Sequence, residues 1–176
     1  MTTNNYSGPT KLLHWLTVTL LVIQYAVGWL MPDVHRNMPT EGLVGWHLSI
    51  GTAIILLVVI RLVWRWIKPS PPPLQTVSPL LQNVARATHF LLYLLLVAFP
   101  LMGWVNASAH NLPLTLFGLI PLPSLAPDSK TSLLHAFGEL HSPFTWVLLA
   151  VVALHVMGAL YHHIIVKDET LRRMLP

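Results

Sequence analysis

Residues 141–163 read HSPFTWVLLAVVALHVMGALYHH, a run without Asp, Glu, Lys or Arg that carries histidines at positions 141 and 155. An α-helix turns ~100° and rises ~1.5 Å per residue, so fourteen steps end about 40° short of four turns and about 21 Å further along the axis. His141 and His155 therefore leave one face of a helix at two depths. Imidazoles inside a bilayer need a partner, and b-type haem iron takes one axial nitrogen from each of two helices. The spacing predicts two stacked haem sites, which require two more histidines.

The composition of the whole chain favours a membrane protein. Of its 176 residues, 54% are hydrophobic and 9% are charged, and the mean hydropathy is +0.62. These values are too apolar for a soluble domain, and the length predicts one domain over residues 1–176. Cysteine is absent, which excludes c-type haem attachment, cysteine-ligated iron–sulfur clusters and thiolate haem ligation. The ten histidines are the candidate metal ligands that remain.

Four apolar segments are long enough to cross a hydrocarbon core of ~30 Å, which needs ~20 helical residues. They cover roughly residues 12–31, 43–67, 84–105 and 132–166. The first is longer than the apolar region of a signal peptide, so we expect it to stay as a helix. The fourth is too long for one simple span, and its first turns should project beyond the membrane. The sequence predicts an all-α integral membrane four-helix bundle that binds two haems.

The Lys and Arg side chains fall mainly on one side of these segments. Only Arg36 and Lys130 lie in the other two connections. The remaining eight of the ten cations flank the chain ends and the second connection: Lys11, Arg61, Arg65, Lys68, Arg86, Lys167, Arg172 and Arg173. Because short cytoplasmic loops carry an excess of Lys and Arg, both termini are predicted to be cytoplasmic.

This topology assigns a depth to each helical histidine. The first helix rises from the inside, so His14 lies in its inner half, and the second descends, so His47 lies in its outer half. The fourth helix also descends, which places His141 outside and His155 inside. We therefore predict that His47 and His141 ligate an outer haem iron, and that His14 and His155 ligate an inner one.

His89 competes with His14 for the inner site. It begins the inner half of the third helix and has Gly103 fourteen residues later, much as His14 has Gly28. We favour His14 as the ligand. His89 would then donate a hydrogen bond to a haem propionate, a quinone oxygen or a backbone carbonyl.

Two further polar side chains are predicted near the inner haem. Arg61 follows His47 by fourteen residues, so it shares that helix face at the inner depth and could pair with a propionate or a quinone headgroup. Otherwise it would extend to the inner lipid headgroups. His162 follows His155 by seven residues, and a rise of ~10 Å is too small to stack a second macrocycle. An interfacial or quinone-contacting role is therefore favoured for His162.

Small residues accompany the candidate ligands. Gly28 follows His14 by fourteen residues, and Gly51 and Gly158 stand about a turn from other candidate ligands. They could clear space for flat macrocycles, or they could serve close helix packing, which is common in membranes.

Several short motifs resemble the bacterial cytochrome b561 family over essentially the whole chain. They are LLHWL at residues 12–16, GWH at 45–47, and an end that runs from His155 through Gly158-Ala-Leu-Tyr-His-His163 to LRRML at 171–175. The resemblance implies a bacterial inner-membrane bundle with two b-type haems, each held by two histidines. In the related cytochrome b subunits of formate dehydrogenases and nickel–iron hydrogenases, helices 1, 2 and 4 supply the ligands. By position this implies His14, His47, His141 and His155, and it favours His14 over His89.

The resemblance also implies a function. Members exchange electrons with ubiquinone, and some resemble superoxide oxidases that pass an electron from superoxide at the outer face to quinone. We therefore expect a membrane oxidoreductase with ubiquinone as its electron acceptor, and no catalytic side chain beyond the haem-binding groups. The side chains that could hold a quinone gather at the inner end: Arg61, Arg65, Arg86, His89, His162 and Arg172.

Alternative functions remain open at this stage. The chain could be the cytochrome b anchor subunit of a larger respiratory dehydrogenase or hydrogenase, or a haem-free channel. Membrane lipid, quinone and a redox partner protein are the expected partners, and no nucleic acid is expected.

The predicted outer surface bears on the electron donor. A surface that steers superoxide should be cationic, but Arg36 and Lys130 face four acidic residues there: Asp33, Glu41, Asp128 and Glu139. This weighs against superoxide as the donor. The histidines of the outer loops are expected to be solvated surface groups: His35, His110 and His135.

Overall fold

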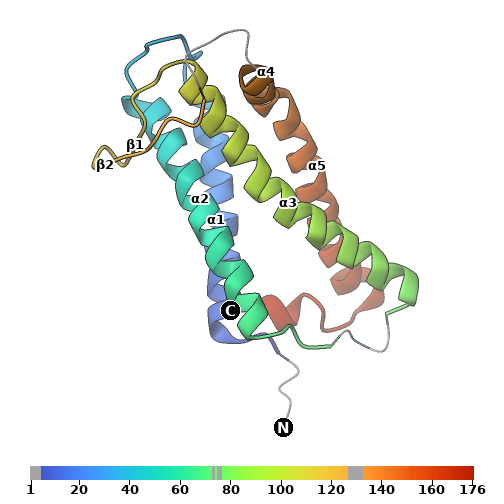
Figure 1. The fold of residues 1–176 in the computed structure, drawn as a ribbon. Helices are drawn as coiled ribbons and strands as arrows, with labels where there is room; N and C mark the ends of the chain where they lie inside the picture. The colour runs from blue at the N-terminus through green and yellow to red at the C-terminus, as the bar shows by residue number, and fades with distance from the viewer. Residues whose placement is uncertain (1–4, 73, 75–76, 127–132) are drawn as a thin grey trace.

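The structure is a computed structural model that describes residues 5–72, 74, 77–126 and 133–176. Four long helices run side by side: α1 (Gly8–Leu30), α2 (Gly42–Ile67), α3 (Pro79–Ala109) and α5 (His141–Tyr161), which continues into the π-helical turn η1 (His162–Val166) (Figure 1). Each of these four spans is long and apolar enough to cross a membrane. The predicted all-α membrane bundle is therefore confirmed.

The bundle has three sides of close helix packing. Helix α1 packs on α2, α2 on α3, and α3 on α5. The fourth side is bridged by side chains, because Tyr25 Oη of α1 donates a hydrogen bond to the carbonyl of Thr145 in α5 (2.6 Å) and Trp29 stacks on Trp146 (ring centroids 6.3 Å apart).

The apolar core lies midway along the bundle. It is built from buried side chains of α2, α3 and α5: Ile50, Ile54, Val58, Leu95, Leu96, Phe99, Met102, Leu148 and Val151. Many large apolar side chains outside this core are exposed, including Leu30 of α1 and Met157 of α5. A helix in lipid gains nothing by hiding such side chains, so this exposure suits a membrane bundle.

The predicted fourth segment is divided in two. A short helix α4 (Leu133–Glu139) ends before α5 begins at His141. Pro143 accounts for the break, because proline has no N–H to bond to the carbonyl of Glu139 but fits the first turn of a new helix. Helix α3 is longer than predicted at both ends, and Ser78 caps its start by accepting a hydrogen bond from the Leu81 amide (3.4 Å).

The two ends of the bundle are closed by different segments. At one end, strands β1 (Thr115–Leu116) and β2 (Ile120–Pro121) form an antiparallel hairpin, which the sequence did not predict. Ser49 of α2 accepts a hydrogen bond from the Phe117 amide (2.9 Å) and so fixes this hairpin beside α2.

At the other end the C-terminal segment, which contains the short helix η2 (Arg172–Met174), crosses to the start of α1 (Figure 1). Lys11 Nζ donates to the Leu175 carbonyl (2.5 Å) and Trp15 Nε1 to the Met174 carbonyl (2.9 Å). The start of α1 and the C-terminus therefore share one end of the molecule, as a bundle of four spans requires.

Candidate haem-binding sites

His47 of α2 and His141 of α5 meet near the hairpin end of the bundle. Their ring centroids are 6.0 Å apart and their planes cross at 76°. An imidazole nitrogen binds a metal at about 2 Å and lies about 1 Å from its ring centroid, so two imidazoles on one ion have centroids roughly 6 Å apart. The predicted outer pair thus has the separation that a shared metal ion requires.

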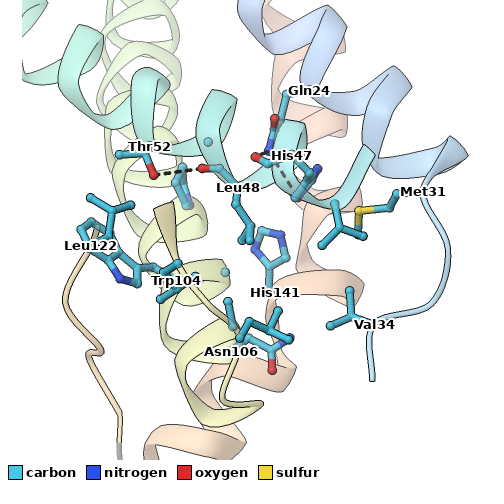
Figure 2. A pocket seen from close by; sticks show the side chains of 17 residues that line it. Gln24, Met31, Val34, His47, Leu48, Thr52, Trp104, Asn106, Leu122 and His141 are labelled. Carbon is cyan, nitrogen blue, oxygen red and sulfur yellow. Dashed lines mark hydrogen bonds between the residues drawn. The ribbon is translucent and has the colours of Figure 1, made fainter. Parts of the chain in front are cut away.

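Both rings reach into one pocket between the helices, as Figure 2 shows. Apart from the two histidines, its lining combines apolar side chains with a few polar ones: Gln24, Met31, Val34, Leu48, Thr52, Trp104, Asn106 and Leu122 (Figure 2).

Helix α3 orients His141. The ring Nδ1 lies 2.9 Å from the carbonyl oxygen of Phe99, and a carbonyl can only accept, so Nδ1 carries the proton. The lone pair of the neutral ring is then on Nε2, which is the arrangement that metal-bound histidines commonly show. Gly103 makes this approach possible, since a Cβ there would stand 3.0 Å from His141 Cε1.

Fewer of the buried polar atoms around His47 have a hydrogen-bond partner. Gln24 Nε2 is 3.2 Å from His47 Nε2 and donates to the His47 carbonyl (3.0 Å). Within the described part of the chain, His47 Nδ1, Gln24 Oε1 and Asn106 Oδ1 are buried without a hydrogen-bond partner. Buried polar atoms are almost always paired in native proteins, so this cluster indicates a site that is completed by a bound group.

Three histidines converge at the level predicted for the inner site. The ring of His155 in α5 lies 6.3 Å from that of His14 in α1 and 5.2 Å from that of His89 in α3. The first separation is the closer to that expected for two imidazoles on one metal. The structure therefore brings both predicted inner candidates to His155.

Arg61 lies against the same cluster. Its Nη2 donates a hydrogen bond to His14 Nδ1 (2.8 Å), and its Cζ lies 5.5 Å from the centroid of the Tyr93 ring. Arg65 Cζ lies 5.8 Å from the same centroid. The arginine expected at the inner depth is thus within hydrogen-bond reach of a predicted inner ligand.

His162 has an acidic partner close to it in the sequence. Its Nδ1 donates to Asp168 Oδ2 (2.7 Å), and the Thr170 amide donates to Asp168 Oδ1 (2.8 Å). Burial raises the pKa of Asp168, but the hydrogen bonds from Thr170 and His162 outweigh it and hold this pKa below its usual value. The ring nitrogen that Asp168 does not contact is Nε2.

The accompanying glycines differ from one another. A Cβ on Gly28 would meet the His47 ring at 3.1 Å, and one on Gly51 would meet Gln24 Nε2 at 3.2 Å. Among the residues that the structure describes, a Cβ on Gly158 would have no atom within 4 Å. Gly28 and Gly51 therefore make room for the outer histidine and its neighbour, whereas Gly158 does not serve such a contact in the described part of the chain.

Sequence reasoning missed several polar groups of these sites. Gln24 is a lone amide in an apolar segment, a signal that was available, because such a group needs a partner inside the membrane. The contacts of Tyr93 and Asp168 had no comparable signal. The prediction of solvated loop histidines was wrong for His110 and His135, whose side chains are only 22% and 18% exposed, because α4 packs on α3 and brings them together.

Comparison with known proteins places these sites in context. Residues 5–176 match the family of prokaryotic cytochrome b561. The chain is 34% identical to cytochrome b561 homolog 2 of Escherichia coli (strain K12) over 182 residues, covering 99% of this chain and 93% of that protein. It is 30% identical to the probable superoxide oxidase CybB of Yersinia pestis over 165 residues, covering 93% of this chain and 92% of the relative.

Proposed function

Because the chain belongs to the prokaryotic cytochrome b561 family, we propose that it is a dihaem cytochrome that transfers electrons across the bacterial inner membrane to ubiquinone. The family itself supports membrane electron transfer by a b-type cytochrome. When bound, b-type haem supplies a carrier that takes up and releases one electron at a time. The observation that carries the proposal is the presence of histidine rings from different helices at two levels of one apolar bundle.

In this proposal His47 and His141 hold the outer haem. The Phe99 carbonyl fixes the His141 ring with Nε2 unprotonated, so this side chain is ready to bind a metal without a change of tautomer. The unpaired buried atoms of Gln24 and Asn106 lie in the lining of the same pocket and fit a site that a polar-edged cofactor completes.

His14 and His155 hold the inner haem in this proposal, and the contact between Arg61 and His14 has a chemical consequence. Arginine only donates, so a neutral His14 that accepts at Nδ1 keeps its proton on Nε2. A His14 that binds a metal through Nε2 must instead carry the proton on Nδ1. Arg61 would then lose its hydrogen bond to His14. We propose that its guanidinium donates to a haem propionate or a quinone oxygen instead.

Two imidazoles on each iron leave no open coordination position, which suits electron transfer better than the binding of dioxygen. Superoxide is the donor we propose to test first, because one relative is named a probable superoxide oxidase. Two superoxide ions would each lose one electron and leave as dioxygen. One ubiquinone would gain these two electrons together with two protons and become ubiquinol.

The orientation is part of the proposal. The start of α1 and the C-terminus lie at one end of the bundle (Figure 1), and the cations concentrated there support our proposal that this end faces the cytoplasm. Cysteine substitutions in the cysteine-free chain, at Ser7 near one end and Ser124 near the other, provide labelling sites. A membrane-impermeant thiol reagent applied to intact spheroplasts should label Ser124→Cys, and labelling of Ser7→Cys instead would reverse the orientation.

The decisive experiment measures haem content and electron transfer on the same purified sample. We expect two non-covalent haems per chain with low-spin spectra, both extracted by acidified acetone, and rapid haem reduction by superoxide followed by reoxidation by ubiquinone. One haem per chain, or a strong high-spin signal, would contradict the paired ligands. Haem reduction only in the presence of a stably bound partner protein would favour the anchor-subunit alternative.

A further inference from the structure

A second cluster of metal-binding side chains lies at the hairpin end of the bundle, apart from the haem ligands. It consists of His110, which caps the end of α3, and His135 and Glu139, which are one turn apart in α4. Their ligand atoms all lie within 4.8 Å of one another, a grouping found once among the residues that the structure describes. Two imidazoles and one carboxylate are a ligand set that zinc sites with an open fourth position use.

The hydrogen bonding of His110 prepares one ring nitrogen for a metal. His110 Nδ1 lies 2.9 Å from the backbone carbonyl of Asn106. This oxygen can only accept, so Nδ1 carries the proton and the lone pair of the neutral ring lies on Nε2. It is this Nε2 atom that faces Glu139 Oε1, at 4.0 Å. A backbone carbonyl that orients the ring of a metal-bound histidine is the usual second-sphere arrangement.

The distances are close to those of a tetrahedral site. Ligand atoms about 2.0–2.1 Å from a zinc ion stand roughly 3.3–3.4 Å apart. Glu139 Oε1 lies 4.0 Å from His110 Nε2 and 3.9 Å from His135 Nε2. Glu139 is 55% exposed and the two histidines are largely buried. All three ligand atoms lie within 4.8 Å of one another, so rotations of the exposed carboxylate and of the two rings would bring them to the separations of one metal site.

The backbone beneath this cluster is also closely fitted. Gly138 lies so near α3 that a Cβ there would stand 2.7 Å from Asn106 Cα. The same Asn106 supplies the carbonyl that orients His110 and lines the outer pocket. We propose that His110, His135 and Glu139 bind a divalent transition metal ion of the zinc class, which clamps α4 to α3 beside the outer pocket. This proposal is independent of the haem assignment.

The test uses the haem-loaded protein after removal of any affinity tag and of contaminating metal. Isothermal titration with Zn²⁺, with metal analysis after dialysis, should give one tight equivalent per chain. His135→Ala and Glu139→Gln should each weaken this binding by at least about 10–100-fold, since even the loss of an outer-sphere group has that effect. His35→Ala is the matched control, because His35 is an exposed histidine of another loop, and its Zn²⁺ affinity should be unchanged.

The haem absorbance of each variant reports whether it is folded. If either variant loses its haem, its titration is replaced by a hydrogen–deuterium exchange measurement on the wild-type protein. Zn²⁺ should then slow exchange in residues 133–139. Absence of saturable Zn²⁺ binding by the wild-type protein would overturn the proposal. Equal loss of affinity in His35→Ala, or unchanged exchange in residues 133–139, would overturn it as well.

Discussion

Gly103→Ala should release the outer haem selectively. The added Cβ would lie 3.0 Å from His141 Cε1 and 3.2 Å from Nδ1, whereas carbon atoms in contact prefer about 3.5–4.0 Å. The ring must therefore move away from α3 by roughly half an ångström, about the tolerance of a preorganised site. Because Phe99 is also on α3, the same movement would stretch the 2.9 Å bond from Nδ1 beyond the usual limit of ~3.2 Å. Loss of such an orienting bond lowers metal affinity by about 10–100-fold.

The assay is the rate at which haem passes from the purified variant to an excess of an apo-haem acceptor, followed by absorbance. Gly103→Ala should show one fast phase, about 10–100 times faster than the wild-type protein, and one unchanged phase from the inner site. Gly158→Ala is the control, because a Cβ there meets no atom of the described residues within 4 Å, and it should leave the outer phase unchanged. If Gly103→Ala keeps both wild-type phases, the placement of His141 against α3 is wrong.

Three further predictions concern the other sites. His47→Ala and His141→Ala should each remove only the outer haem and His155→Ala only the inner one, while His163→Ala keeps both; a His14→Ala variant that retains two low-spin haems would transfer the inner ligand role to His89. Arg61→Leu should lower the reduction potential of the inner haem, since a fixed positive charge favours the electron-loaded form. Arg61→Lys should recover part of that potential. If a redox titration of the Leu variant shows two unshifted potentials, Arg61 has no role at the haem and serves only to orient the protein in the membrane. Asp168 has a lowered pKa, so its stabilising effect is present above the unfolded value of 3.8 and is lost as pH falls through the folded pKa. The difference in melting temperature between wild type and Asp168→Asn should therefore be larger at pH 5 than below about pH 4, and a difference that does not fall over this range would refute this.

The features that could be predicted from the sequence are those that depend only on length and position along a single helix. Apolar length predicted the four spans, and spacing along each span predicted which histidines share a depth, since rise per residue is fixed. That is why the rings of His47 and His141 could be matched without knowing how the helices pack. The number of haems and the identity of the ligands stay predictions. The break before α5 had a signal in Pro143, whose effect on the preceding turn follows from its missing N–H.

The unpredicted part depends on contacts between segments that are distant in the sequence. The meeting of His110 with His135 requires α4 to fold back on α3, and neither local propensity nor periodicity determines that packing. The contact between Gln24 and His47 depends in the same way on the rotation of α1 against α2. Local patterns assign a side chain to a face and a depth, but its neighbour on the facing helix comes from tertiary packing.

At the two histidine levels, the protein alone differs in how far it holds the imidazoles in the tautomer that binds a metal. At the outer level the Phe99 carbonyl already holds His141 in the tautomer that binds a metal. At the inner level the bond from Arg61 holds His14 in the opposite tautomer, so binding a metal there requires a proton shift on the ring and a new acceptor for the guanidinium. A donor must leave a ring nitrogen at both levels, Gln24 at His47 and Arg61 at His14, but only the inner level needs the proton shift as well, and that shift costs additional free energy. The inner haem should consequently bind after the outer one when the apoprotein is titrated with haem, and Arg61→Leu, which removes the competing donor, should bring the two binding steps closer together.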